Sequence, residues 1–185
     1  MAWIRVVGED EADEELNAVL RDVVGGRGKL SNILAVHSLL PATMKAHMDL
    51  YTSVMFGASG LSRAEREMIA VVVSATNECS YCVRHHGAAL EHYWKDEERV
   101  SRFAEDHRSA EVSKRMRAVL DYAEKLTASP ASVRETDIEH LREHGLSDAD
   151  ILSVNLIASY FDFVNRIALG LGVAFSEEEV SGYNC

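Results

Sequence analysis

The helical spacing of apolar residues, with very few helix-breaking residues, constrains the fold of this chain most. Only two prolines and eleven glycines interrupt 185 residues, which favours long helices over many short strands. Apolar side chains recur every three or four residues in most segments, as in amphipathic helices. We therefore predict an all-α fold in which residues 1–185 form a single domain with one hydrophobic core.

Acidic first turns, capping boxes and glycine or proline breaks divide the chain into segments. The clearest start is the capping box of Ser62 and Glu65. The clearest break is Asn77–Glu78, ahead of the first cysteine. We predict helices over 9–24, 41–56, 62–76, 79–94, 96–106, 110–126, 135–144 and 147–169.

A short internal echo suggests a duplicated helical unit. The sequence GLSRA at 60–64 recurs as GLSDA at 145–149, and each copy opens a long apolar helix. We predict a redox unit at about 41–95 and a second, non-catalytic repeat at about 130–172. The alternative is chance, because such helix-capping sequences recur widely.

Charge and hydropathy exclude several classes of protein. The net charge of −11 and the lack of a basic run argue against a nucleic-acid-binding protein. No stretch approaches the ~20 apolar residues of a membrane span. The short apolar start is followed directly by acidic residues, unlike a signal peptide. We predict a cytoplasmic protein, in whose reducing surroundings a close cysteine pair is more often catalytic or metal-binding than structural.

The pattern E-x11-C-x2-C-x3-H, formed by Glu67, Cys79, Cys82 and His86, is the most informative motif. The two cysteines and the histidine stand at i, i+3 and i+7, within an arc of about 60° on one helix face. His86 lies one turn beyond Cys82 and so serves it better than Cys79. If the chain reverses at 77–78, an antiparallel hairpin brings Glu67 near His86.

These residue types suit redox chemistry at sulfur. A thiol has a pKa of about 8.5, and only the thiolate is a good nucleophile. A helix start lowers that pKa, an imidazole takes the proton, and a carboxylate orients the imidazole. A second thiol resolves the oxidised first thiol as a disulfide. We predict Cys82, Cys79, His86 and Glu67 as catalytic residues.

The neighbouring residues Tyr81 and His85 point away from the cysteine face, and we predict supporting roles for them. The remaining histidines show no ligand spacing and are expected to be solvated or simple hydrogen-bonding residues; they are His37, His47, His92, His107, His140 and His144. Cys185 is expected to be a free thiol.

Two simpler interpretations of the cysteine pair stay open. A zinc half-site is one, although a second ligand pair with zinc spacing is missing from the sequence. A structural pair on an apolar face, with His86 only solvated, is the other. We predict neither a metal nor a cofactor.

The motif and its surroundings, at 62–67, 77–86, 122–127 and 161–168, resemble the alkyl hydroperoxidase D-like proteins of the carboxymuconolactone decarboxylase-like superfamily. The resemblance extends to the branch of uncharacterised peroxidase-related proteins and covers nearly the whole chain. It implies a helical fold with a repeated unit that assembles into dimers, trimers or hexamers. It also implies that Cys82 attacks the peroxide, Cys79 resolves, and His86 with Glu67 relays protons. Some members carry a histidine where this chain has Tyr81.

The resulting hypothesis is a thiol-dependent peroxidase. It would reduce hydrogen peroxide or organic hydroperoxides and be recycled by an external thiol or dithiol reductant, such as a lipoyl or thioredoxin-like protein. The alternatives are a non-peroxidatic thiol–disulfide oxidoreductase or redox sensor, a helical assembly protein with vestigial thiols, and a decarboxylase-like lactone enzyme. A homo-oligomer is also predicted, because 68–75 and 151–169 look apolar around most of their girth.

Overall fold

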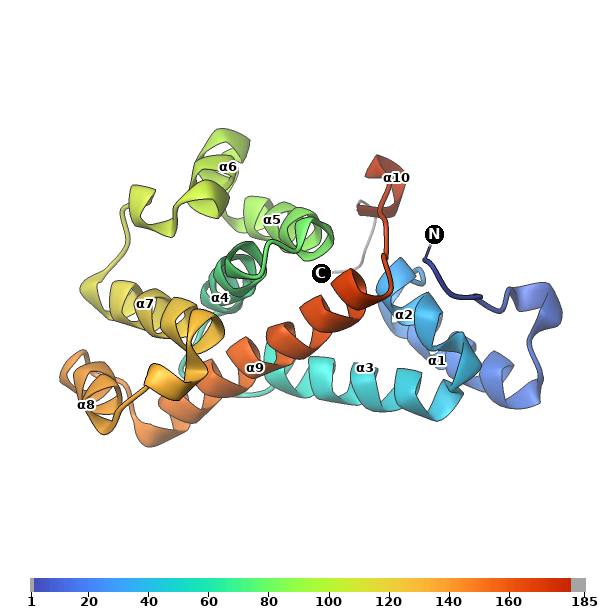
Figure 1. Ribbon diagram of the computed structural model, residues 1–185, viewed down its shortest axis with the longest axis horizontal. Coiled ribbons are helices and arrows are strands. Elements are labelled where there is room, and N and C mark those ends of the chain that lie inside the picture. Colours follow the sequence, from blue (N-terminus) through green and yellow to red (C-terminus); the bar gives the residue numbers. More distant parts are fainter. Residues whose placement is uncertain (1, 181–185) are drawn as a thin grey trace.

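A computed structural model describes residues 2–180, and the predicted all-α fold is confirmed within them (Figure 1). These residues hold ten α-helices, four short 3₁₀ turns and no strand. The helices are α1 (Glu14–Arg27), α2 (Asn32–Ala35), α3 (Pro41–Phe56), α4 (Arg63–Thr76), α5 (Ser80–Trp94), α6 (Glu97–Glu105), α7 (Lys114–Ala128), α8 (Glu135–Glu143), α9 (Asp148–Gly170) and α10 (Glu177–Val180). Cys185 lies outside the described residues.

Helix α4 forms the centre of the fold. Every residue from Arg66 to Ser74 is buried, because α5, α7 and α9 all pack against this helix (Figure 1). The apolar girth of 68–75 is therefore covered within the chain and needs no partner subunit. This removes one of the two reasons for expecting an oligomer.

The hairpin of α4 and α5 follows the capping signals of the sequence. The Ser62 hydroxyl accepts from the Glu65 N–H, and the Glu65 carboxylate accepts from the Ser62 N–H, as a capping box requires. The chain then reverses through Asn77 and Glu78, where Glu78 adopts a φ of 55°. Cys79 is the N-cap of α5. The predicted hairpin is thus confirmed.

Helix α9 starts in the same way as α4. Ser147 and Asp150 form its capping box, and the preceding Gly145 has a φ of 83°, which a side chain would strain. Asp150 also accepts from the N–H of Gly60, so the two GLS sequences lie side by side. The duplication of a whole unit stays a prediction.

Two predicted helix starts were wrong. Helix α1 begins at Glu14 and not at residue 9, because Asp13 caps it by accepting from the N–H of Leu16. Helix α7 begins at Lys114 and not at residue 110, because Ser113 supplies its cap. In both cases a capping side chain further along the chain satisfies the free N–H groups of the first turn.

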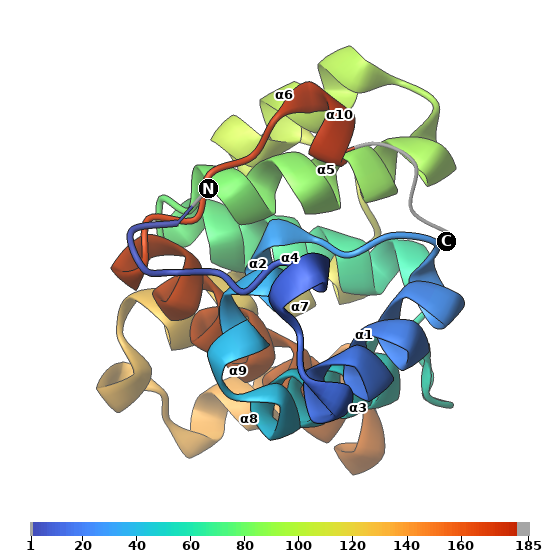
Figure 2. The ribbon, with the colours of Figure 1, turned by 90° about the vertical axis from the view of Figure 1, so that its right-hand side faces the viewer.

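The short helix α10 packs on α5 of the same chain (Figure 2). Arg84 of α5 pairs with Glu177 at 2.8 Å, and Lys29 donates to the carbonyl of Glu178. The C-terminal segment therefore covers part of its own domain as far as Val180. Within residues 2–180, no helix has the length and hydropathy that crossing a membrane requires.

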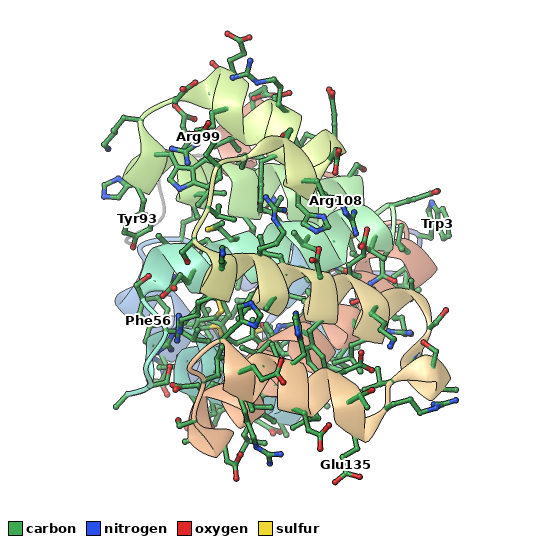
Figure 3. The ribbon with its side chains drawn as sticks, turned by 90° about the vertical axis from the view of Figure 1, so that its left-hand side faces the viewer. Trp3, Phe56, Tyr93, Arg99, Arg108 and Glu135 are labelled. Atoms are coloured by element: carbon green, nitrogen blue, oxygen red, sulfur yellow. The ribbon has the colours of Figure 1, made fainter. Side chains whose placement is uncertain are left out.

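Several large apolar side chains lie at the surface. Trp3, Phe56 and Tyr93 appear there in Figure 3, with Trp3 the most exposed of them. Helix α9 buries one face but leaves Leu152 and Phe163 exposed. Of the apolar surface expected at 151–169, one face of α9 is therefore exposed and available to a partner subunit. The oligomer itself stays a prediction.

Candidate functional site

The α4–α5 hairpin brings Glu67 and His86 into direct contact. Nδ1 of His86 lies 2.7 Å from Oε2 of Glu67, and the Glu67 side chain is fully buried. The two residues lie at similar distances from the turn, so antiparallel helices place them side by side. The contact predicted from the sequence is present.

The hydrogen bond fixes how His86 can act. An ionised carboxylate only accepts, so Nδ1–H of His86 donates to Glu67 and a neutral ring keeps Nε2 as its proton acceptor. Burial alone would raise the pKa of Glu67, but His86 and then Arg63 outweigh burial and lower it. Phe161 of α9 packs edge-on against the His86 ring at 4.5 Å and fixes its position.

Arg63 holds the other oxygen of Glu67, a contact that the sequence analysis missed. Its Nη2 lies 2.6 Å from Oε1 of Glu67, and the guanidinium also donates to Tyr51 and stacks on Phe56. The carboxylate is therefore bound by a cation on one side and an imidazole on the other. The spacing of four residues could have suggested this ion pair, but not its burial.

Both thiols of the cysteine pair are free and buried. The hydrogen bond from Cys82 lowers the pKa of Cys79 to about 7; burial opposes this, and the N–H groups of Cys82 and Tyr81 add to it. The pKa of Cys82 is raised, first by its bond to Cys79 and then by burial. The pair thus loses its first proton near neutral pH, and the charge rests on Cys79 at the helix start.

Two further polar side chains meet Cys82. Asn165 of α9 and Ser74 of α4 form hydrogen bonds with Cys82 that act to lower its pKa. Asn165 also donates to Ser74 at 3.1 Å and accepts from Asn77 at 3.0 Å, so its orientation is fixed. These buried groups can stabilise a thiolate when the charge moves to Cys82.

Cys82 lines a small cavity of about 80 Å³, and Cys79 does not. His86, Glu67 and Arg63 line the same cavity, as do side chains from α2, α3 and α9. A cavity of this size holds a few non-hydrogen atoms. Of the two thiols, Cys82 is therefore the one that a small molecule in the cavity meets.

Comparison with known proteins identifies the fold. Residues 41–125 match the model of the carboxymuconolactone decarboxylase family. A crystal structure of an uncharacterised peroxidase-related protein from Silicibacter sp. TM1040 is 31% identical, with a TM-score of 0.88 over 97% of this chain and 94% of that one. The chain belongs to the carboxymuconolactone decarboxylase family.

Two other relatives agree with this assignment. A structure from Ralstonia eutropha JMP134, described as an alkylhydroperoxidase AhpD core and uncharacterised peroxidase-related protein, is 31% identical, with a TM-score of 0.86 over 97% of this chain and 94% of that one. The uncharacterised protein YdfG of Bacillus subtilis (strain 168) is 25% identical over 146 residues, which cover 77% of this chain and 96% of YdfG. The resemblance deduced from the motif is thereby confirmed.

In this member of the carboxymuconolactone decarboxylase family, Tyr81 and His85 connect the cavity to the C-terminal segment. The Tyr81 hydroxyl donates to Glu179 at 2.8 Å and accepts from the N–H of Ile33. Nε2 of His85 lies 2.9 Å from the same carboxylate. Burial would raise the pKa of Glu179, but His85, the N–H of Asn32 and Tyr81 lower it to about 2.

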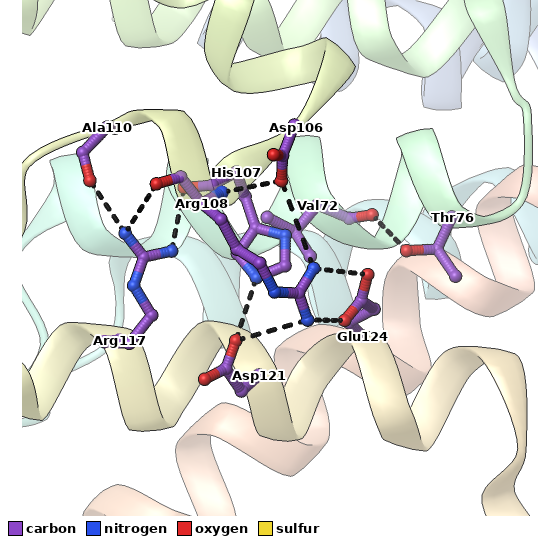
Figure 4. A network of polar contacts seen from close by, with 9 residues as sticks. All are labelled: Val72, Thr76, Asp106, His107, Arg108, Ala110, Arg117, Asp121 and Glu124. Atoms are coloured by element: carbon purple, nitrogen blue, oxygen red, sulfur yellow. Dashed lines mark hydrogen bonds and ion pairs between the residues drawn. The ribbon is translucent and has the colours of Figure 1, made fainter.

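One group of side chains with metal-like spacing lies elsewhere in this family member, among the described residues. His107, Asp121 and Glu124 approach one another, but Arg108 pairs with both carboxylates (Figure 4). The guanidinium already occupies both carboxylates, and its charge would repel a cation. His107 is buried and bonded to Asp121 at 3.1 Å, so it is not solvated.

Proposed function

We propose that this protein is a thiol-dependent peroxidase that reduces hydrogen peroxide or a small organic hydroperoxide at Cys82. One observation carries the proposal. Cys82 lines a small cavity together with His86, whose Nδ1 is held by the buried Glu67. The nucleophile, the base and the group that orients the base therefore belong to one site.

Attack begins with a proton transfer inside the cysteine pair. Cys82 passes its proton along the shared hydrogen bond to the Cys79 thiolate, and the charge moves to Cys82, where Asn165 and Ser74 stabilise it. The Cys82 sulfur then attacks the outer oxygen of the peroxide. An S–O bond forms, the O–O bond breaks, and Cys82 becomes a sulfenic acid while the other oxygen leaves as alkoxide or hydroxide.

Resolution consumes the second thiol. The sulfur of Cys79 attacks that of Cys82, the S–OH bond breaks, and the Cys79 proton leaves with the hydroxide as water. His86, through Nε2, carries this proton, and Glu67 stabilises its charged form. An external thiol or dithiol then reduces the disulfide and restores both thiols.

Oxidation of the reduced protein tests the proposal. Stopped-flow mixing with hydrogen peroxide should oxidise wild-type protein, and mass spectrometry with a sulfenic-acid trap should locate the product. Cys79→Ser should accumulate the sulfenic acid at Cys82, and Cys82→Ser should abolish rapid oxidation. Rapid oxidation of Cys82→Ser, with the label on Cys79, would reverse the assignment of the two thiols.

A thiol–disulfide oxidoreductase is the second candidate, because Cys79 has a pKa of about 7. Enzymes of that kind attack with a low-pKa thiol at a helix start. Cys79 is fully buried, however, and a protein disulfide would need the helix to move before reaching it. Rates with hydrogen peroxide and with oxidised lipoamide separate the two functions: a faster reaction with lipoamide favours the second.

We also propose that the protein assembles as a homo-oligomer through the exposed face of α9. Leu152, Leu156 and Phe163 recur at helical spacing on this face. Light scattering at micromolar concentration should give more than one chain per particle, and a monomer would contradict the proposal.

A further inference from the structure

A chain of hydrogen bonds leads from the surface to the cavity. Tyr160 of α9 lines the cavity, and its hydroxyl lies 2.8 Å from Nε2 of His47. Nδ1 of His47 lies 3.1 Å from Nε2 of His37, and Nδ1 of His37 lies 2.9 Å from the exposed Thr43 hydroxyl. His47 and Tyr160 are buried, whereas His37 is partly exposed.

The outer end of this series of hydrogen bonds, at Thr43, fixes which group donates in each bond. The single proton of the Thr43 hydroxyl goes to the carbonyl of Leu40 at 2.7 Å, so Thr43 must accept from Nδ1–H of His37. Burial lowers the pKa of His37 and so favours its neutral ring, in which Nε2 accepts from His47. A neutral His47 then accepts from Tyr160 through Nε2.

Protonation of His37 reverses every bond inward of it. Both nitrogens of a charged His37 donate, so Nδ1 of His47 must accept and its Nε2–H must donate to Tyr160. The Tyr160 hydroxyl then no longer donates to His47, so its proton can go to another acceptor, such as a peroxide in the cavity that Tyr160 lines. The two arrangements differ by one proton, so a proton added at His37 becomes available at Tyr160.

The place of Tyr160 suits one step of the proposed reaction. In an in-line attack the leaving oxygen points away from the sulfur, so a proton donor on another wall of the cavity than α5 suits it. Cys82 and His86 belong to α5, whereas His47 and Tyr160 belong to α3 and α9. Helices α3 and α5 lie on opposite sides of the molecule in both views (Figures 1 and 2).

We propose that Tyr160 is the acid that protonates the leaving oxygen of the peroxide, and that His47 and His37 resupply it. The inference rests on the proposed peroxidase function. The alkoxide or hydroxide takes the Tyr160 proton, Tyr160 takes the Nε2 proton of His47, and His47 takes the Nε2 proton of His37. One proton is delivered for each O–O bond broken, and His37 regains it from solvent.

Few other titratable groups lie near the hydrogen bonds that join His37, His47 and Tyr160. Helix α2 has no titratable side chain, and the Lys45–Asp49 pair of α3 is exposed. The remaining titratable or charged side chains of the cavity are Tyr51, Arg63, Glu67, Tyr81, Cys82, His85 and His86. A test must therefore separate protons used at sulfur from protons used at the leaving oxygen.

Two peroxides with different leaving groups make this separation. Hydroxide from hydrogen peroxide needs a proton as it leaves, whereas acetate from peracetic acid does not at neutral pH. Tyr160→Phe should slow oxidation of reduced Cys82 by hydrogen peroxide about 100-fold and leave the rate with peracetic acid within about threefold. Tyr93→Phe, an exposed tyrosine of α5, is the matched control and should change neither rate.

The pH dependence tests the role of His37. The ratio of the hydrogen peroxide rate to the peracetic acid rate removes the ionisation of the thiols. In the wild type this ratio should fall as the pH rises through the pKa of His37, which lies below 6.5. His37→Gln should flatten the ratio, and the exposed His92→Gln should keep it.

Each alternative result has a defined meaning. Equal slowing of both peroxides by Tyr160→Phe, no slowing, or a flat ratio in the wild type would overturn the inference and leave the peroxidase function standing. If neither peroxide oxidises Cys82 of the wild type, the proposed function fails and the inference fails with it.

Discussion

Removing the charge of Arg63 tests whether the charged groups around Glu67 keep that carboxylate ionised. In Arg63→Met the buried Glu67 keeps only His86 as an ionic or hydrogen-bonding partner of those described above. Unit charges about 4 Å apart attract by about 4 kcal/mol at an effective dielectric constant of about 20. Leaving one charge of a buried pair alone costs about 3–5 kcal/mol. For Arg63→Met we expect the free energy of unfolding to fall by about 3 kcal/mol and Tm to fall by about 6–12 °C.

Glu67→Gln should lower the free energy of unfolding by less, about 1–2 kcal/mol. The remaining Arg63 side chain is 20% exposed and bonded to Tyr51, so water can reach its charge. The double variant Arg63→Met/Glu67→Gln removes both charges of this pair and should be more stable than Arg63→Met. Urea unfolding at one fixed protein concentration measures all four proteins. A double variant less stable than Arg63→Met would refute the reasoning.

The pH dependence of stability tests the same reasoning, because the wild type and Arg63→Met should respond to pH differently. In the wild type the pKa of Glu67 is lowered, so its contribution to stability is present above the unfolded pKa and is lost as the pH falls through the folded one. In Arg63→Met the pKa of Glu67 should rise, because burial is then opposed by His86 alone. The cost then lies at neutral pH and disappears as Glu67 gains a proton. The stability difference should shrink between about pH 7 and about pH 5, and a constant difference would contradict this.

Three further predictions concern the cysteine pair, the Tyr81 hydroxyl and two glycines. Cys82→Ala removes a hydrogen bond to Cys79, so the pKa of Cys79 should rise from about 7 toward 9.0; ultraviolet thiolate absorbance measures it, and an unchanged pKa would contradict the shared proton. Tyr81→Phe removes a hydroxyl that bonds two other segments and should cost about 1–3 kcal/mol in urea unfolding; a loss below about 0.5 kcal/mol would argue against that role. Gly145→Ala, at a φ of 83°, should cost about 1–2 kcal/mol, whereas Gly25→Ala, in open space within α1, should add about 0.5–1 kcal/mol; thermal melts shifting in the same direction would contradict this contrast.

Local regularity made much of the fold and part of the site predictable. A helix advances by a constant rise, so counting residues from the turn was enough to bring Glu67 beside His86. Capping boxes made the starts of α4 and α9 predictable, because their side chains and the N–H groups that they bind lie within one turn of the sequence. The misplaced starts of α1 and α7 lie where acidic or apolar residues precede the true capping side chain. Periodicity extends through such residues, and only the cap ends it.

The missed residues depend on contacts between distant parts of the chain. His47 and Tyr160 are 113 positions apart, and neither has a neighbour in sequence that marks it as part of a site. His47 was expected to be solvated or a simple hydrogen-bonding residue, and the packing of α3 against α9 brings Tyr160 to it. Arg63 illustrates a different obstacle, because an acid–base pair at i, i+4 reads the same on a solvated face and on a buried one.

The division of the cavity between helices bears on how far its substrate can be inferred from relatives. The family model matches residues 41–125, which contain the thiols, Glu67 and His86. The wall supplied by α9, with Tyr160 and Asn165, lies outside that match. One of these residues stabilises the attacking sulfur and the other protonates the leaving oxygen in the reaction proposed above. In that reaction the matched part of the chain supplies both thiols, His86 and Glu67, whereas α9 supplies one group for the attacking sulfur and one for the leaving oxygen.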